Sequence, residues 1–518
     1  MQEIPLWRGG RERTSLDVRV LYDYRGGPLA RVALAPSLLV HRVAAELRAA
    51  AEPGADLPAL WDAIAAAGRL LATAELGGCS PDEHARLVTL ATGAPIADSR
   101  QALTELASGM LHVRDALRWQ TPGGSLEPFL THRLEPSPGR ACGWVPVGRV
   151  LGFVAPSNHP AVHLTWVLAL AMGWAVAVRP GADDPFTPWR VLLALRAAGF
   201  PAERVALLPG GHDLVPALVE HCDRTVAYGG ATLAALLGRD PRVLFNGPGR
   251  SKVLVDGEAV GGTAGAQRAR AIGEKADGEA GETGAGEAVS GAAGTTGEAF
   301  SGTPGPAPLG NGALPSAARV EAGPGSAASR PEHPVDFLVD CILHDGGRKC
   351  TCASAVLLRG EAPGLLEAVA ERLRGLPLLD PLDPAARVPA WKDAAAARRT
   401  PAEVVESHGL TFVRPALVLD VDPADPRFGL ELPAPWATAT QVPPGTDPLP
   451  LLRGSLAVTL LSRDRALAGR CLREPSIQKL FVGPIPPWHT EPGAPHKGRL
   501  ADFLFTAKAH REAVIPWS

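Results

Sequence analysis

The chain has little net charge and few cysteines. Each of these features argues against particular classes of protein. Its 518 residues carry a formal net charge of −3, which gives no electrostatic reason to expect nucleic acid or a membrane surface as a partner. The 7 cysteines are an odd number at irregular spacing, which predicts a reducing, cytoplasmic compartment rather than a disulfide framework. Residues 1–13 contain charges and no apolar core, so we expect no secretory signal.

Long uncharged runs are also scarce. One of them, residues 161–178, reaches the length at which a membrane span becomes a hypothesis. His163 interrupts this run, Gly173 is a helix stop within it, and Arg179–Pro180 closes it. We therefore expect a buried helix followed by a buried parallel strand, and no membrane span.

The spacing of apolar residues divides the remaining chain into segments of different kinds. Residues 1–131 favour helices, one of them at 37–51, after a strand pair at 18–22 and 29–32. From residue 150 to 255, short apolar runs alternate with amphipathic stretches. This alternation is typical of a βαβ series, so the sequence predicts the α/β class with helices on both faces of a parallel sheet.

Several helix ends are marked by their own residues. Ser80 and Glu83 form a capping box, and the helix that they begin is expected to end at Gly93. A later helix should stop at Gly199, and Asp213 is expected to cap the one after it.

Residues 257–332 differ in composition from the segments around them. Gly, Ala, Glu, Ser and Pro dominate, and Phe300 is the only aromatic residue. Such a segment cannot bury enough apolar surface to offset its ordering entropy, so we expect a disordered, low-complexity insertion. Folding should resume with a helix at 335–339, and a further helix and two strands are expected at 364–376, 416–419 and 456–460.

One cysteine follows a flexible loop that carries cations. Cys350 comes after Gly346, Gly347, Arg348 and Lys349. The two cations would favour a thiolate, and the glycines would let a backbone N–H approach a reacting carbonyl oxygen. The alternative is a buried cysteine that only fills space.

An asparagine lies at the end of a predicted strand. Residues 150–160 indicate a buried strand that ends in a turn at Asn158. Ligands of open α/β sheets bind at the carboxyl ends of the strands. The Asn158 amide is placed to donate to an oxyanion, which a thiol attacking a carbonyl group needs, although a turn residue bonded to its own backbone is the alternative.

A series of segments, in this order, resembles the motifs of the aldehyde dehydrogenase superfamily. The segments are 156–160 (Pro-x-Asn-x-Pro), 175–180, 198–210, 228–232, 346–354 and 431–435. The resemblance covers most of the chain apart from the insertion. It implies a Rossmann-type cofactor domain and an α/β catalytic domain, with an NAD or NADP cofactor.

The resemblance also implies a domain layout and a set of site residues. The cofactor domain would comprise 1–131 and 145–256, the catalytic domain 333–480, and the bridging segments of a homo-oligomer 132–144 and 481–518. Cys350 would be the nucleophile and Asn158 the oxyanion donor. The cofactor contacts would be Arg179, Pro180, Gly229, Gly230, Gly247, Gly249 and Glu431. No acidic residue follows Arg179–Pro180 at 181–182, which favours NADP because Arg179 would meet its 2′-phosphate.

The departures from the superfamily pattern bear on the direction of the reaction. Asn246 stands nearest the place of the usual general-base glutamate, Arg348 replaces a glutamine, and Pro433 replaces a phenylalanine. This pattern resembles the acyl-reducing branches, namely coenzyme A-acylating reductases and the fatty acyl reductases of bioluminescence. It is also similar to proteins associated with phenazine-type antibiotic pathways, which places the chain in secondary metabolism.

The expected activity is that of an oxidoreductase acting on the aldehyde or oxo group of its donor. Cys350 would form a thiohemiacetal that hydride transfer interconverts with a thioester. Loss of a general base slows hydrolysis by about 10²–10⁴-fold, so reduction of an activated acyl group to an aldehyde is favoured. Coenzyme A or a carrier would then present the acyl group.

Other interpretations remain open at this stage. An ordinary aldehyde dehydrogenase would make an acid, a cysteine acyltransferase or hydrolase would use His159 as its base, and a degenerate member would only bind or assemble. No metal is expected, because the Cys-x-Cys spacing at 350–352 is tighter than that of a zinc knuckle, even with Cys341 and His344 nearby. The histidines of the carboxyl-terminal stretch show no ligand spacing; they are His489, His496 and His510.

Overall fold

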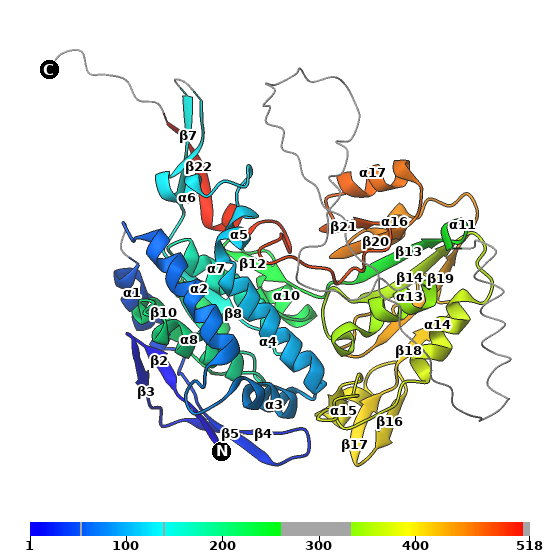
Figure 1. The fold of residues 1–518 in the computed structure, drawn as a ribbon, viewed down its shortest axis with the longest axis horizontal. Helices are drawn as coiled ribbons and strands as arrows, with labels where there is room; N and C mark the ends of the chain where they lie inside the picture. The colour runs from blue at the N-terminus through cyan, green and yellow to red at the C-terminus, as the bar shows by residue number, and fades with distance from the viewer. Residues whose placement is uncertain (52–53, 138–139, 261–332, 511–518) are drawn as a thin grey trace, which may run out of the picture. The chain divides into compact units, whose positions relative to one another are not determined.

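The computed structural model describes residues 1–51, 54–137, 140–260 and 333–510 (Figure 1). The predicted insertion at 257–332 lies outside the described residues from residue 261 onwards. Its first residues are described and form the short helix α11 (Gly257–Val260), so the expectation of disorder from residue 257 is wrong for these four.

The predicted parallel sheet is confirmed in the first half of the chain. Seven strands lie in the order β12-β11-β8-β9-β10-β2-β3. Their bounds are β2 (Leu6–Arg8), β3 (Arg11–Arg13), β8 (Val150–Val154), β9 (Ala175–Arg179), β10 (Val205–Leu207), β11 (Arg224–Tyr228) and β12 (Val243–Asn246). The strands from β8 to β12 pair in parallel, while β2 and β3 add an antiparallel edge that the sequence reading missed.

Helices cover both faces of this sheet, as predicted. Along β8, Leu151 and Phe153 belong to one buried apolar cluster, while Val150 and Val154 belong to another. This period of two sends alternate side chains to opposite faces. The first cluster includes residues of α2 (Leu57–Thr73), α7 (Leu164–Ala171) and α8 (Phe186–Ala197), and the second includes residues of α1 (Leu39–Ala50) and α9 (Leu214–His221).

Most predicted helix ends are confirmed, and one is not. Ser80 and Glu83 form the capping box of α3 (Pro81–Thr92), and Gly93 ends that helix in the left-handed conformation at φ 73°. Asp213 precedes α9, but its side chain makes no capping hydrogen bond. Its own backbone is already helical, at φ −63° and ψ −22°, whereas a capping residue needs an extended backbone for its side chain to reach the first free N–H groups.

The uncharged run at 161–178 forms the buried helix and strand that the sequence predicts. It contains α7 and most of β9, which pairs in parallel with β8. In the described part of the chain, no helix is long and apolar enough to cross a membrane.

A second sheet, all parallel, lies in the other half of the chain. Its order is β18-β19-β14-β13-β20-β21. The bounds are β13 (Ser251–Asp256), β14 (Ala353–Arg359), β18 (Ala416–Val418), β19 (Trp436–Val442), β20 (Ala457–Leu461) and β21 (Lys479–Val482). Val356 and Leu358 of β14 face a cluster with α13 (Pro334–Leu343) and α14 (Leu365–Arg374), whereas Leu357 faces one with α16 (Leu449–Leu452) and α17 (Arg465–Arg473).

Three small sheets complete the arrangement. The predicted strand pair is confirmed as β4 (Val18–Tyr22) and β5 (Pro28–Ala33), with β1 (Gln2–Ile4) beside it. The sheet of β15 (Ala390–Trp391), β16 (Val404–Ser407) and β17 (Leu410–Val413) was not predicted. The third sheet, of β6 (Arg133–Ser137), β7 (Arg140–Pro146) and β22 (Phe505–His510), joins the two predicted bridging segments.

Several more helices lie in the described part of the chain. They are α4 (Ile96–Leu111), α5 (Val113–Arg118), α6 (Glu127–Thr131), α10 (Ala231–Leu237), α15 (Ala394–Arg398) and α18 (Leu500–Leu504), with the 3₁₀ helices η1 (Pro160–His163), η2 (Ala202–Arg204) and η3 (His344–Gly347). Helix α13 leads into η3, and η3 leads into the loop of Cys350, so the predicted helix before the cysteine is confirmed.

Candidate active site

The turn after β8 lies against the loop that carries the predicted nucleophile. Nδ2 of Asn158 donates a hydrogen bond to the main-chain oxygen of Arg348 over 2.9 Å. Nη2 of Arg348 in turn donates to the main-chain oxygen of Ser157 over 3.2 Å. These bonds bring the predicted oxyanion donor to within two residues of Cys350 in the loop.

The cysteine loop follows a backbone path that favours glycine. Asp345, Gly346 and Gly347 all have positive φ, at 50°, 61° and 71°. A Cβ on Gly347 would lie 2.4 Å from the main-chain carbon and oxygen of Ala434. This position therefore requires glycine both for its conformation and for its close contact.

Gly249 packs directly on the cysteine. A Cβ there would lie 1.9 Å from the main-chain oxygen of Cys350, and Oγ of Ser251 donates to the same oxygen over 3.0 Å. The carbonyl group of Cys350 is thus fixed by the start of β13. This contact gives Gly249 a structural reason to be glycine that the sequence interpretation, which assigned it to the cofactor, did not contain.

The carboxylate of Glu431 binds the same turn. Its Oε2 accepts hydrogen bonds from the backbone N–H of Gly249 over 2.6 Å and of Arg250 over 3.2 Å. Burial raises the pKa of Glu431, although these two bonds oppose the shift. One oxygen of the residue expected at the cofactor ribose is therefore held by the backbone.

The thiol of Cys350 is protonated at neutral pH. Burial raises its pKa to about 12, the charge of Glu431 adds to the shift, and Lys479 and Lys497 oppose it. The sequence interpretation expected an activated thiolate, and this is wrong for the described state because desolvation exceeds the effect of the nearby cations.

Lys349 and Arg348, the two cations expected to activate the thiol, contact other groups. Nζ of Lys349 lies 2.7 Å from Asp345 and 3.1 Å from Glu105 of α4. Nη1 of Arg348 lies 3.4 Å from Oγ1 of Thr92. The two loop cations therefore tie the loop to its surroundings, and the cations that act on the thiol come from residues 479 and 497.

His159, the base of the hydrolase alternative, belongs to the same ion-pair network. Its Nε2 lies 3.1 Å from Oδ2 of Asp345, and its Nδ1 accepts from the backbone N–H of Ala161 over 3.2 Å. Burial alone would raise the pKa of Asp345, but the charges of His159 and Lys349 hold it well below its usual range. Both ring nitrogens of His159 thus face partners other than Cys350.

The histidine nearest the thiol is one that the sequence interpretation passed over. Nε2 of His496 lies 3.8 Å from Sγ of Cys350. Burial lowers the pKa of His496 to about 3, with Lys479 and Lys497 adding to the shift. No spacing rule links a residue in a proline-rich stretch to a cysteine 146 positions earlier in the chain, so only tertiary structure reveals the pair.

Asn246, which the resemblance puts nearest the place of the superfamily's general-base glutamate, is buried. Asn246 is 5% exposed, and its Oδ1 has no hydrogen-bond partner in the described residues. Its main-chain oxygen accepts from the N–H of Gly229 over 3.1 Å. Nζ of Lys497 donates to the main-chain oxygen of Phe245 over 3.3 Å, so a lysine reaches the end of β12.

The carboxyl end of β9 presents guanidinium groups that fit a phosphate. Arg179 is 8% exposed, and its described hydrogen bonds go only to main-chain oxygens, those of Gly211 and Pro180. Arg19 of β4 donates to the main-chain oxygen of Ala182, and its Nε is buried without a partner in the described residues. These groups would hold the anionic part of a nucleotide cofactor.

Two glycine turns lie beside this edge. A Cβ on Gly247 would be 3.1 Å from the Phe245 ring, whereas Gly230 has open space within 4 Å of the corresponding position. The Gly229–Gly230 turn joins β11 to α10. The open side of Gly230 leaves room for a cofactor to approach the backbone.

Cys352 differs from Cys350 in its surroundings. It is 5% exposed, and its Sγ donates to the main-chain oxygen of His344 over 3.1 Å. The ring of His344 stacks on Trp488 at a centroid distance of 3.8 Å. Among the residues that the structure describes, no group of His, Cys, Asp or Glu side chains has the arrangement of a metal site.

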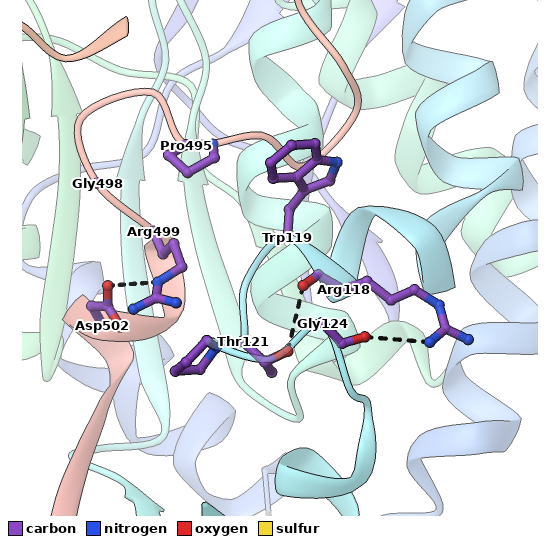
Figure 2. Close-up of a pocket in the computed structure, with 9 residues that line it drawn as sticks. Arg118, Trp119, Thr121, Gly124, Pro495, Gly498, Arg499 and Asp502 are labelled. Atoms are coloured by element: carbon purple, nitrogen blue, oxygen red, sulfur yellow. Dashed lines mark hydrogen bonds and ion pairs between the residues drawn. The ribbon is translucent and has the colours of Figure 1, made fainter. Parts of the chain in front are cut away.

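An open cavity of about 670 Å³ lies beside the carboxyl-terminal segment (Figure 2). It is lined by residues of the turn after α5 and of the carboxyl-terminal segment, namely Arg118, Trp119, Thr121, Pro122, Gly124, Pro495, Gly498, Arg499 and Asp502. Figure 2 shows the ion pair of Arg499 with Asp502, which is 2.9 Å long. None of the predicted site residues lines this cavity.

The chain is similar in sequence to known aldehyde dehydrogenases over part of its length. Residues 11–233 match the family model described as the aldehyde dehydrogenase family. A segment of 146 residues is 30% identical to malonate-semialdehyde dehydrogenase 1 of Shouchella clausii. This match spans 27% of the chain and 28% of that relative.

The fold is similar to that of solved aldehyde dehydrogenases over nearly the whole chain. An indole-3-acetaldehyde dehydrogenase in complex with NAD⁺ superposes with a TM-score of 0.69 at 18% identity, covering 99% of this chain and 97% of that one. An aldehyde dehydrogenase of Bacillus cereus gives a TM-score of 0.70 at 14% identity, with 98% and 96% covered. The expected aldehyde dehydrogenase-like α/β fold is therefore confirmed.

Proposed function

We propose that this chain, which has the aldehyde dehydrogenase fold and matches that family's model over residues 11–233, is an NAD(P)-dependent oxidoreductase acting on aldehyde or activated acyl groups. The observation that carries the proposal is the contact between the Asn158 amide and the loop of Cys350, at 2.9 Å from Arg348. A nucleophile and an amide donor meet there at the carboxyl edge of a parallel sheet, where ligands of such sheets bind.

Cys350 attacks the carbonyl carbon of the substrate. The carbonyl oxygen becomes an oxyanion, which the Asn158 amide and the backbone N–H of Cys350 stabilise. Nδ2 of Asn158 has two N–H bonds, and only one of them is used by the Arg348 oxygen. The second remains for the oxyanion, while the first keeps the amide in place.

The cofactor site lies along the ends of β8, β9 and β11. A nicotinamide cofactor supplies or accepts the hydride that interconverts thiohemiacetal and thioester. Arg179 and the Gly229–Gly230 turn would hold it, and Gly247 and Glu431 would lie at its nicotinamide end. One of the similar structures contains NAD⁺. Here NADP is favoured, because Arg179 and Arg19 have no ion pair with Asp or Glu in the described residues and a 2′-phosphate would supply one.

The residue at position 246 sets the direction of the reaction. Its amide cannot take a proton from water, and its Oδ1 has no hydrogen-bond partner in the described residues. General-base assistance is worth about 10²–10⁴-fold, so the lack of a carboxylate at position 246 slows hydrolysis of the thioester on Cys350. Reduction of an acyl group brought by coenzyme A or a carrier is then the physiological reaction.

The proposal also covers the cellular compartment, the size of the substrate and the oligomeric state. The protein would act in the cytoplasm on small substrates, as a homo-oligomer. The sheet of β6, β7 and β22 would provide its subunit contacts, because β6 and β22 are its two edge strands among the described residues.

Nicotinamide absorbance tests the function directly. The purified protein would be mixed with a straight-chain aldehyde and NADP⁺, with and without coenzyme A, and acyl-enzyme would be sought by intact-mass spectrometry. We expect acyl-enzyme on Cys350 without coenzyme A and multiple turnovers with it. Rapid acid formation without acyl-enzyme would identify an ordinary aldehyde dehydrogenase. No reaction here, and none in a parallel assay with an acyl-coenzyme A and NADPH, would leave a binding role.

A further inference from the structure

We propose that His496 is the proton carrier of Cys350: it takes the Sγ proton as the thiol attacks a carbonyl carbon and returns it when the sulfur leaves. This proposal rests on the proposed function, since it needs Cys350 to be the nucleophile. It assigns the chain a catalytic residue from a segment outside every motif that the sequence analysis used.

The geometry is that of a thiol–imidazole hydrogen bond. Nε2 of His496 lies 3.8 Å from Sγ of Cys350, a separation at which sulfur still makes hydrogen bonds. Within the described ranges, the ring of His496 has no other hydrogen-bond partner. Its nearest ring neighbour is Tyr228, at a centroid distance of 6.5 Å.

The segment that carries His496 is anchored on both sides. Nε2 of Gln120 donates to the main-chain oxygen of Gly493 over 2.6 Å, and Oε1 of Gln120 accepts from the N–H of Ala501 over 3.1 Å. A Cβ on Gly493 would lie 2.1 Å from the oxygen of Ala116. On the other side, Lys497 donates to Phe245. His496 therefore points at the thiol from a fixed backbone.

The charges around the pair decide how the proton moves. Lys479 of β21 and Lys497 disfavour a positive charge on His496. Glu431 disfavours a negative charge on Cys350. Tyr228 of β11 adds no charge, because burial raises its pKa to about 12. Both members of the pair are neutral at rest. These charges disfavour a thiolate–imidazolium pair before attack, so we infer that proton transfer accompanies formation of the C–S bond.

The electron and proton balance closes for the pair and the substrate once one proton is taken from water in the reductive direction. During attack the C–S bond forms, the carbonyl π electrons move to oxygen, and the Sγ proton moves to Nε2 of His496. When an activated acyl group is the substrate, its leaving group departs with its bonding electrons and takes the proton from Nε2. In the reductive direction the leaving group has already removed that proton, so Nε2 takes a second proton from water. When the aldehyde is then released, the C–S bond breaks, its electrons return to Sγ, and Nε2 passes this second proton to sulfur.

Acylation without any cofactor isolates this step. The rate at which p-nitrophenyl acetate acylates Cys350 would be compared in the unmodified protein, His496→Gln and the control His489→Gln, whose side chain is 48% exposed. We expect His496→Gln to acylate about 10²–10⁴-fold more slowly, and His489→Gln to match the unmodified protein. Equal rates in all three would overturn the proposal.

Two further readouts separate proton transfer from a structural role. Added imidazole should restore acylation in His496→Ala in proportion to its neutral form, which a packing defect would not show. Acylation of the unmodified protein should also be slower in deuterium oxide, because a proton moves as the C–S bond forms. Absence of this isotope effect would overturn the proposal even where the variants fail to fold.

The proposed function can fail separately from this inference. Acylation of Cys350→Ala at the rate of the unmodified protein would show that another residue is the nucleophile. Normal acylation of Cys350 together with undiminished acylation of His496→Gln would reject only the role of His496.

Discussion

The ammonium group of Lys349 lies 2.7 Å from the carboxylate of Asp345, and the two side chains are only 9% and 4% exposed. Glu105 of α4 is a second anion for the same ammonium group, at 3.1 Å. The burial of this cluster directly before Cys350 links the shape of the cysteine loop to a helix of the first half of the chain. Lys349 thus positions the nucleophile rather than activating it.

Removing this cation should destabilise the protein strongly. Lys349→Met removes the cation shared by Asp345 and Glu105 and leaves Asp345 with His159 as its nearest remaining partner. Breaking a buried ion pair costs about 3–5 kcal/mol, which is the upper bound expected here. Urea unfolding followed by fluorescence would measure the loss. The control is Lys392→Met, which removes a pair with Asp183 at 3.2 Å whose members are 30% and 43% exposed, and which should cost about 0–1 kcal/mol. Similar losses in both variants would contradict the role of the Lys349 cluster.

The two neighbouring thiols should behave differently. Cys350→Ala should abolish turnover, whereas Cys352→Ala should only reduce it, because Cys352 is a buried side chain bonded to the oxygen of His344. Iodoacetamide labelling with peptide mapping tests the assignment without any substrate. Preferential modification of Cys352 in the native protein would speak against Cys350 as the nucleophile.

Asn246→Glu should shift the products toward acid. A carboxylate at the end of β12 would activate water against the thioester, provided that its pKa remains low enough in this enclosed place. Product analysis after mixing with aldehyde and NADP⁺ would follow the acid. Asn246→Gln is the matched control, since it adds the same length without a base, and acid formation by both variants alike would exclude the explanation.

Stability should fall as the solution becomes mildly acidic. His84 and His163 are 2% and 0% exposed, and burial lowers the pKa of each to about 3. In the unfolded chain each histidine has a pKa of about 6.5, so below that pH the unfolded state binds more protons than the folded state. The free energy of unfolding therefore falls by up to about 1.4 kcal/mol per pH unit for each histidine, until the pH reaches the pKa of the folded state. Urea midpoints between pH 7 and pH 4 would measure the slope. The double variant His84→Gln, His163→Gln should reduce this slope, and His496, whose pKa burial also lowers to about 3, would keep part of it.

The segment at 262–328 should be dispensable for folding and chemistry. Its Gly- and Ala-rich composition supplies no core, so a short Gly/Ser linker should replace it with nearly unchanged activity and thermal stability. Size-exclusion chromatography and the acylation assay would test this. Loss of soluble expression on replacement would mean that the segment packs or assembles.

The sequence predicted the layers of the fold better than its small sheets. Buried parallel strands such as β8 and β14 are near-continuous apolar runs, and alternating helices identify their class. The short strands β15 to β17 have two to four residues each, and their pairing is decided by contacts made elsewhere in the chain. Asp213 illustrates the same limit at a helix end, because residue type alone does not fix the backbone angles that capping needs.

The candidate site was only partly visible in the sequence. Asn158 and Cys350 lie in motifs with local signatures, so the order of residues sufficed to pair them. Lys349 and Arg348 were misread, since their nearness in sequence to the thiol said nothing of the carboxylates and carbonyl groups that hold them. His496 was missed because its contact with Cys350 spans 146 residues and depends on the anchoring of Gly493 by Gln120.

The wide separation of His496 from Cys350 also has a consequence during synthesis of the protein. Domains fold as units from the amino-terminal side while the chain is being made. The loop of Cys350 can therefore form against β13 well before residue 496 has been translated. Until then the thiol lacks the proton acceptor that we propose, so acylation assisted by His496 can begin only after the carboxyl-terminal segment has been translated and has folded against the cysteine loop.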